Sequence, residues 1–372
     1  MAKDASTRNA ILVTVLVTLV FLAGIWAGRF LTRLQLEAPI AQWDRARTLG
    51  ALVKSDEDRR ARAQAYDDPD QAIAAMDGYG WAPPNLPAPF VGVGPAPGEH
   101  TGITIGAGLF RGRDGVEMPK PPGRFRVFVT GGSTAFSSGA PSEEATIGAF
   151  LGACLKKTRA NAEVITLANP AWASTQERIA IEQRISELAP DVVVSFTGVN
   201  DVHWGVRGRD TAWFRTYWDE TFYRIDAAVF DLAGRPFADP IVVTEAPTPV
   251  ERLAEVFTKN VAISGFVLDR VGARYVVALQ PNLAVSSKQI TAREEALLEV
   301  MGEERRAHYV KGYEAFRAGL GAVDAANVSW WDLSDVFAGR SEEIFLDNYH
   351  FGDRGNRIIA EALCARFEEL SP

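Results

Sequence analysis

From Gly123 onward, short apolar runs alternate with segments of helical periodicity. The apolar runs cover Arg126–Thr130, Val164–Ala168, Val192–Thr197 and Tyr275–Leu279, and a weaker fifth covers Ser329–Leu333. Continuously apolar runs of this length are typical of strands buried on both faces. Their alternation with helices predicts a parallel sheet between two helical layers. We therefore expect an α/β fold, a flavodoxin-like three-layer α/β/α sandwich with a five-stranded parallel sheet.

The segments between these runs predict the helices. The stretch TQERIAIEQRISELA, residues 175–189, has a mostly one-sided apolar stripe and ends at Pro190. Other helices are expected over about residues 143–158 and 253–271, and from about Gly355 to the end of the chain. In such sheets, ligands bind beyond the carboxyl ends of the strands, so we expect the chemistry directly after each apolar run.

Two glycines and a serine follow the first run, in the order Gly131-Gly132-Ser133-Thr134. The glycines let the backbone turn sharply, because they adopt positive φ values that other residues resist. A phosphate-binding loop would require GxxxxGK[ST] and a dinucleotide loop GxGxxG, and this stretch matches neither. It therefore presents Ser133 either as a nucleophile at a strand end or as part of a plain turn.

Further polar groups are predicted at the same edge of the sheet. Asn200, which follows the third run, either donates its side-chain N–H to an oxyanion or forms an Asx turn. Asp347 precedes His350 by three residues, so its carboxylate can orient an imidazole that acts as general base. The alternative is an exposed pair without a shared role. Together with Ser133, these residues favour a catalytic site over separate coincidences.

In these residues the sequence resembles the SGNH (GDSL-like) hydrolases. Gly131-Gly132-Ser133-Thr134 is similar to their first block, Gly198-Val199-Asn200-Asp201 to the third, and Asp347-Asn348-Tyr349-His350 to the fifth. The resemblance covers residues 123–372, about two-thirds of the chain. This chain has Gly132 where the commoner first block has Asp, and Ala171 where the second block usually has Gly.

The resemblance implies a mechanism and a set of site residues. Ser133 would attack an ester carbonyl, His350 would accept its proton, and Asp347 would orient the imidazole. The Ser133 N–H, the Ala171 N–H and the Asn200 side chain would bind the oxyanion. The resemblance implies no cofactor and no metal, and the substrate would be an acylated carbohydrate or lipid.

Three functions are compatible with these residues. The first is a serine esterase that removes an acyl group from an extracytoplasmic glycan or lipid. An O-acyltransferase (O-acetyltransferase) of a cell-envelope polysaccharide would use the same residues and would differ in the nucleophile that reaches the acyl-enzyme. The third is a non-catalytic scaffold, which the presence of Ser133, Asn200, Asp347 and His350 disfavours.

The N-terminal region contains a candidate membrane span. Residues Ala10–Gly28 carry no charge over 19 positions, and a helix of this length spans about 28 Å, close to a bilayer core. A cleavable signal peptide is the alternative, but Ile25 and Arg29 interrupt the small-x-small site that it requires. We therefore predict a single-pass anchor over residues 1–31, with the catalytic domain outside the cytoplasm.

Composition assigns the remaining regions. Residues 32–122 are predicted to form a polar stalk and a Pro/Gly-rich linker, and residues 123–372 the SGNH hydrolase-like domain. Within that domain, residues 203–252 form an aromatic-rich insertion that packs into a core or lid, floors a sugar-binding cleft or touches the membrane. His203 would line the pocket or make a structural hydrogen bond.

Charge and cysteine usage limit the partners. The net charge is −8 and there is no Lys/Arg-rich run, so no nucleic-acid partner is expected. The four histidines are scattered, so we expect no histidine-rich metal site. Cys154 and Cys364 lie far apart in predicted helices, and we expect two small buried apolar residues there, not a disulfide.

Overall fold

The computed structural model describes residues 12–32, 47–235, 238–239 and 241–370. The chain divides into two units, Met1–Ala46 and Arg47–Pro372. The described part of the first unit is a helix over Leu12–Thr32 whose side chains are all exposed. By length and composition it can cross a membrane, and a signal sequence would meet the same test. Residues 1–11 of the predicted anchor lie outside the described residues.

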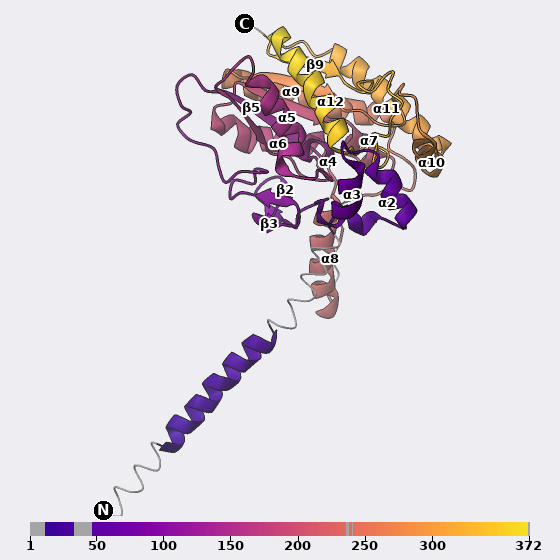
Figure 1. Cartoon of the computed structure of the whole chain (residues 1–372). Coiled ribbons are helices and arrows are strands. Elements are labelled where there is room, and N and C mark those ends of the chain that lie inside the picture. Colours follow the sequence, from indigo (N-terminus) through magenta and orange to yellow (C-terminus); the bar gives the residue numbers. More distant parts are fainter. Residues whose placement is uncertain (1–11, 33–46, 236–237, 240, 371–372) are drawn as a thin grey trace, which may run out of the picture. The chain divides into compact units, whose positions relative to one another are not determined.

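The second unit is built around a five-stranded parallel sheet (Figure 1). Its strand order, β6-β5-β7-β8-β9, is the flavodoxin-like order 2-1-3-4-5, which confirms the predicted fold class. Strand β7 is buried at every position, which explains why its sequence is apolar throughout. The strands cover Phe125–Gly131 (β5), Ala162–Thr166 (β6), Val192–Thr197 (β7), Arg274–Leu279 (β8) and Val328–Asp332 (β9).

Helices cover both faces of the sheet. Helices α5 and α12 pack against each other, and α9 packs against both α6 and α11. Right-handed crossovers between parallel strands put these two groups on opposite faces. The helices are α4 (Ser133–Phe136), α5 (Ile147–Leu155), α6 (Ser174–Ala180), α7 (Val199–Gly205), α8 (Tyr217–Leu232), α9 (Val250–Arg270), α10 (Ala292–Met301), α11 (Glu303–Gly321) and α12 (Asp353–Arg366).

The two cysteines form a disulfide, so the prediction of two isolated buried thiols is wrong. Cys154 on α5 and Cys364 on α12 have Cα atoms 6.3 Å apart, and both residues are partly exposed. Their separation of 210 residues offers no spacing by which the pair could be recognised. They meet because both helices cover the same face of the sheet.

Residues 47–122 belong to the same compact unit as the sheet, whereas composition predicts a stalk and a linker there. Proline and glycine in this stretch occupy the turns and edges of two antiparallel hairpins, β1–β2 and β3–β4. The elements are α2 (Asp56–Ala63), α3 (Pro69–Ala75), β1 (Asn85–Ala88), β2 (Gly92–Pro95), β3 (Gly98–His100) and β4 (Ile103–Ile105).

A small second core joins this N-terminal region to the C-terminal part of the chain. Leu49, Tyr66 and Met76 are buried in one cluster with Leu346. The Arg62 guanidinium donates a hydrogen bond from Nη1 to the Leu346 carbonyl at 2.9 Å. Leu346 directly precedes Asp347, so the helices that were expected to form a stalk support a predicted catalytic residue.

The predicted insertion, residues 203–252, divides into a buried and an exposed part. The Trp204 side chain is fully buried, and its ring centroid lies 4.5 Å from that of Tyr217 and 5.6 Å from that of Phe214. Trp213, by contrast, is 74% exposed. Core packing therefore accounts for some of the aromatic residues of the insertion, but not for all of them.

Candidate active site

Ser133 lies at the start of α4, directly after β5. A Cβ at Gly131 would lie 2.4 Å from the Phe196 carbonyl oxygen, and a Cβ at Gly132 would lie 2.1 Å from Asn200 Nδ2. Position 131 therefore requires glycine, because its neighbour is backbone, whereas a side chain at position 132 would have to displace the end of the Asn200 side chain. The Asp of the commoner family pattern at position 132 would therefore go together with a different placement of the Asn200 amide.

Ser133, His350 and Asp347 form a continuous hydrogen-bonded chain. His350 Nε2 lies 2.7 Å from Ser133 Oγ, and His350 Nδ1 lies 2.7 Å from Asp347 Oδ2. The other carboxylate oxygen, Oδ1, accepts the backbone N–H groups of Tyr349 and His350, each at 2.9 Å. The three-residue spacing thus folds the carboxylate back onto the imidazole, and the chain has the geometry of a nucleophile, a base and an orienting acid.

Asp347 is held in its charged form. Burial acts to raise its pKa, but the His350 imidazole and the backbone N–H groups of Tyr349 and His350 lower it to about 2. A carboxylate ionised throughout the physiological range keeps a proton on Nδ1 of the imidazole. Nε2 is then free to accept the Ser133 proton.

The predicted oxyanion donors lie beside the serine. Asn200 Nδ2 donates to the Trp172 carbonyl at 2.7 Å, which uses one of its two amide protons. Ala171 has a φ of +75°, a backbone conformation that glycine adopts freely and alanine resists. The Ala171 carbonyl accepts the Trp204 Nε1–H at 3.1 Å, which helps to hold this conformation. The structure thus brings the loop that contains Ala171 next to Gly132 and Asn200.

The residue after Asn200 is Asp201, and its buried carboxylate forms hydrogen bonds to Ser174 at the start of α6. Asp201 accepts the Ser174 hydroxyl at 2.6 Å through Oδ1 and the Ser174 backbone N–H at 3.1 Å through Oδ2. Burial raises the pKa of Asp201 to about 6 despite these hydrogen bonds. The start of α6 is therefore fixed relative to α7. In sequence, Asp201 is the last residue of the stretch that resembles the third family block, and its position there predicts no role.

His203 makes structural hydrogen bonds close to the triad. Its Nε2 lies 2.8 Å from the Tyr217 hydroxyl, and its Nδ1 lies 3.3 Å from the Tyr349 hydroxyl. Burial, together with the charges of Arg207 and Arg305, lowers the pKa of His203 to about 3, so the ring is neutral. Of the two predicted alternatives, the hydrogen-bonding role is therefore observed.

Trp81 contacts the His350 imidazole, and no pattern in the sequence predicted this contact. Its ring centroid lies 4.4 Å from that of His350, with 59° between the ring planes. The residue before it, Gly80, accepts the Gly139 N–H at 2.8 Å, and the Tyr66 hydroxyl donates to the Gly139 carbonyl at 2.7 Å. The N-terminal region therefore supports both the segment that follows the serine and the histidine.

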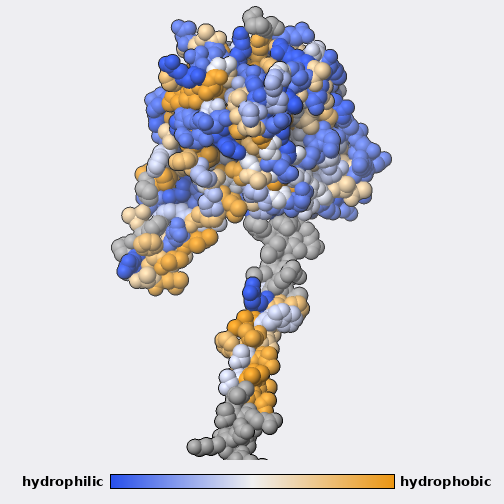
Figure 2. Space-filling model, turned by 90° about the vertical axis from the view of Figure 1, so that its left-hand side faces the viewer, coloured by the Kyte–Doolittle hydropathy of each residue, from blue (hydrophilic) through white to orange (hydrophobic). Residues whose placement is uncertain are grey.

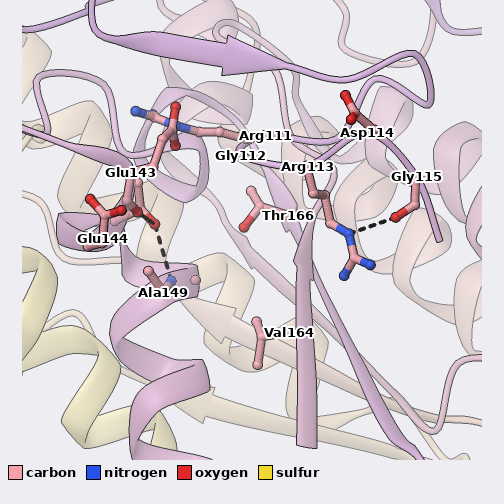
Figure 3. Close-up of a pocket in the computed structure, with 12 residues that line it drawn as sticks. Arg111, Gly112, Arg113, Asp114, Gly115, Glu143, Glu144, Ala149, Val164 and Thr166 are labelled. Carbon is pink, nitrogen blue, oxygen red and sulfur yellow. Dashed lines mark hydrogen bonds and ion pairs between the residues drawn. The ribbon is translucent and has the colours of Figure 1, made fainter. Parts of the chain in front are cut away.

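A cavity of about 540 Å³ is lined by residues from the segment after β4, from α5 and from β6, and Ser133, Asp347 and His350 are not among its lining residues (Figure 3). Arg111 and Glu143 lie at one side of it, and Arg113 at the other (Figure 3). The buried Arg111 guanidinium donates to the carbonyls of Phe136 and Ser137 and to Glu143. This cavity therefore adjoins residues that support the end of α4. Among the described residues, no group of three or more His, Cys, Asp or Glu side chains is placed to hold a metal ion.

Comparison with known proteins identifies structural likeness alone. No family model matches the sequence, and no curated protein matches it. An acetyl xylan esterase, AlAXEase, is 15% identical over 65% of this chain and 98% of its own, with a TM-score of 0.41. A GDSL-like lipase from Bacteroides thetaiotaomicron is 12% identical over 69% of this chain and 93% of its own, with a TM-score of 0.40. TesA is 14% identical over 66% of this chain and 99% of its own, with a TM-score of 0.40.

These similarities are similarities of fold. Their identities and TM-scores are too low to carry an argument about substrate or reaction. The functional argument therefore depends on the side chains around Ser133.

Proposed function

We propose that this protein is a serine esterase of the SGNH (GDSL-like) type that removes an acyl group from an extracytoplasmic glycan or lipid. The observation that carries the proposal is the continuous hydrogen-bonded chain from Ser133 through His350 to Asp347. A non-catalytic scaffold would not require this geometry, or the glycines that make room for it.

The reaction takes place in two steps. The Ser133 oxygen attacks the ester carbonyl carbon while His350 Nε2 takes the hydroxyl proton, and the resulting imidazolium is stabilised by Asp347. The oxyanion accepts hydrogen bonds from the N–H groups of Ser133 and Ala171 and from the second amide proton of Asn200. The imidazolium then protonates the departing alcohol. In the second step, His350 deprotonates a water molecule that attacks the acyl-enzyme, and Ser133 regains its proton as the acid leaves.

The alternative is an O-acyltransferase, in which a sugar hydroxyl replaces water in the second step. One observation favours it. Ser133 and His350 are only 9% and 5% exposed, and Trp81 covers one side of the imidazole. A buried acyl-enzyme is less accessible to bulk water than to a bound acceptor.

We propose that the second unit lies outside the cytoplasm and is anchored by the N-terminal helix. Two features support this location. The helix Leu12–Thr32 is long and apolar enough to cross a bilayer. The Cys154–Cys364 disulfide is a type of bond that persists in oxidising compartments. In intact cells, protease added outside should cleave beyond Arg47, and full protection there would contradict this topology.

A serine-reactive fluorophosphonate tests the nucleophile. The full chain in detergent should be labelled, whereas Ser133→Ala should not be. Ser142→Ala is the matched control, because Ser142 is exposed and close in sequence, and it should be labelled like the wild type. A folded wild-type protein that takes up no label would favour the scaffold.

A second assay separates hydrolysis from transfer. The full chain is given an activated acetyl ester together with an unacetylated oligosaccharide. Free acetate alone indicates an esterase, and acetylated oligosaccharide indicates a transferase. Both products should disappear in Ser133→Ala.

A further inference from the structure

Helix α8 exposes a continuous apolar stripe. Ile225, Val229 and Leu232 lie on one side of this helix at spacings of four and three residues, and they are 56%, 59% and 89% exposed. None of the described side chains of α8 is buried. In Figure 2 the projection at the lower left, labelled α8 in Figure 1, carries hydrophobic residues among polar ones. A stripe of this kind is typical of a helix that has a binding partner.

The contacts of α8 with the body are concentrated at its N-terminal end. Tyr217 reaches Trp204 and His203, and Asp219 lies beside Gly92 of β2. The rest of the helix projects away from the sheet (Figure 1). A helix of 16 residues gains little stability in water from its own hydrogen bonds, so a surface that receives the stripe would stabilise it.

The exposed residues continue beyond the helix. Trp213 precedes α8 and is 74% exposed, and Val242 and Val243 follow it at 76% and 50%. Tryptophan is enriched at the interface between water and the hydrocarbon core of a membrane. Exposed apolar residues therefore also occur in both of the segments that flank α8 in the sequence.

The position of Arg47, where the chain enters the second unit, bears on which partner covers the apolar stripe of α8. Arg47, the first residue of the unit, donates from Nη1 to the Pro83 carbonyl at 2.7 Å, immediately before the β1–β2 hairpin. The same hairpin contacts α8 through Gly92. Residues 33–46 connect the membrane-spanning candidate to Arg47, and a chain of this length reaches at most about 50 Å. Arg47, the residue to which this connection leads, and α8 therefore both contact the β1–β2 hairpin or the residues directly before it.

The net charge of α8 indicates which lipid headgroups the helix can approach. The helix carries Asp219, Glu220, Asp226 and Asp231 against Arg224, so its net charge is 1 − 4 = −3. An acidic helix is repelled by anionic headgroups, unlike the basic helices that bind them. Binding must therefore come from burial of the apolar stripe, and it should favour zwitterionic headgroups.

We propose that α8 and its flanking segments dock onto the zwitterionic lipid surface of the membrane in which the protein is anchored, with the stripe Ile225, Val229 and Leu232 inserted below the headgroups. This inference rests on the proposed anchoring but not on the proposed reaction. Docking would hold the second unit in one orientation on the bilayer, so that the active site faces its substrate at a fixed height.

Two cysteine variants on opposite faces of α8 test the proposal. Both native cysteines are in the disulfide, so Val229→Cys and the matched control Arg224→Cys can each be labelled with an environment-sensitive fluorophore. The full chain is reconstituted at one copy per phosphatidylcholine nanodisc. We expect lipids brominated in the acyl chain to quench the probe at position 229 at least about threefold more than the probe at 224. Aqueous iodide should show the reverse preference. Replacing part of the phosphatidylcholine by phosphatidylglycerol should weaken the quenching by lipid.

Three results would overturn the proposal. Equal access of iodide to both probes would mean that the stripe stays in water. Protection of position 229 from iodide without quenching by brominated lipid would mean that a protein covers it. Protection that appears only when each disc holds two chains would identify a second copy. If the chain does not enter nanodiscs, the proposed anchoring is wrong, and the same probes with phosphatidylcholine vesicles then report docking by α8 alone.

Discussion

The surroundings of Ser133 and the surface of α8 differ in how their side chains are held. Asp347 accepts hydrogen bonds from the imidazole and from two backbone N–H groups, and the loops around it are fixed by buried residues from both ends of the chain. On α8, the apolar stripe faces solvent. Many partners therefore hold the side chains around Ser133 in one geometry, as the proposed reaction would require. Apolar side chains without partners mark a surface that meets its partner elsewhere.

Removing residues 1–122 should have the largest effect on the first region. A chain that begins at Gly123 lacks the helices that bury Leu346 and the residues that hydrogen-bond to Gly139. We expect it to lose most of the 5–15 kcal/mol that is typical of a folded domain. A chain that begins at Arg47 is the control and should unfold cooperatively in urea, as monitored by circular dichroism. If the two chains were equally stable, residues 47–122 would not contribute to the stability of the unit, as expected of a linker.

The free energy of unfolding should depend on pH through the buried Glu177 carboxyl. Burial raises the pKa of Glu177 to about 8 despite its hydrogen bond from Thr197. The folded state therefore binds more protons than the unfolded state, so this contribution to stability is fully present below about pH 4.5 and is lost as pH rises through 8. We expect the free energy of unfolding to fall by on the order of 3 kcal/mol between pH 5 and pH 8.

The variant Glu177→Gln should flatten this dependence in urea unfolding. The exposed Glu187→Gln is the matched control and should retain it. If both variants follow the wild-type curve, Glu177 does not carry the effect.

Substituting Ala171 should produce a smaller change. Its φ of +75° is strained for alanine, so Ala171→Gly should stabilise the protein by about 0.5–1 kcal/mol in thermal unfolding. Ala173 has an ordinary extended backbone, with a φ of −109°, so Ala173→Gly should instead destabilise by a similar amount. Destabilisation by both variants would show that the positive φ at position 171 is not a source of strain.

The smallest effect is expected on α8. Leu232 is 89% exposed, so Leu232→Ala should change the free energy of unfolding in detergent by less than about 0.5 kcal/mol. Leu346 is fully buried in the second core, and Leu346→Ala should cost about 2–5 kcal/mol. A large effect at Leu232 would mean that its stripe is already covered in the isolated protein, which would remove the contrast between the two regions.

Much of the sheet could be predicted from the sequence, because its strands are apolar throughout. Val192–Thr197 is a strand with the same bounds in the prediction and in the structure. The edge at which Ser133, Asn200 and His350 meet also followed from the sequence, because the carboxyl ends of parallel strands share one edge. The apolar pattern of the strands and the rule that parallel strands end at one edge were sufficient to predict the sheet and the place of these residues.

Features that depend on long-range packing could not be predicted. Cys154 and Cys364 meet only through the docking of α5 against α12. Trp81 lies in a proline-rich stretch, and nothing near it in sequence indicates that it reaches His350. The composition of residues 47–122 describes their turns accurately, but it carries no information on the surface against which their apolar side chains pack.

The support of Asp347 by residues near Arg47 has a consequence for biosynthesis. The site requires the first helices of the unit and also Asp347 and His350, which lie among the last 26 residues of the chain. A ribosome makes these helices long before it reaches Asp347 and His350, so no nascent chain that stops before His350 contains Ser133, Asp347 and His350 together. If the N-terminal helix directs export during synthesis, these three residues first come together after the chain has left the compartment in which it was made.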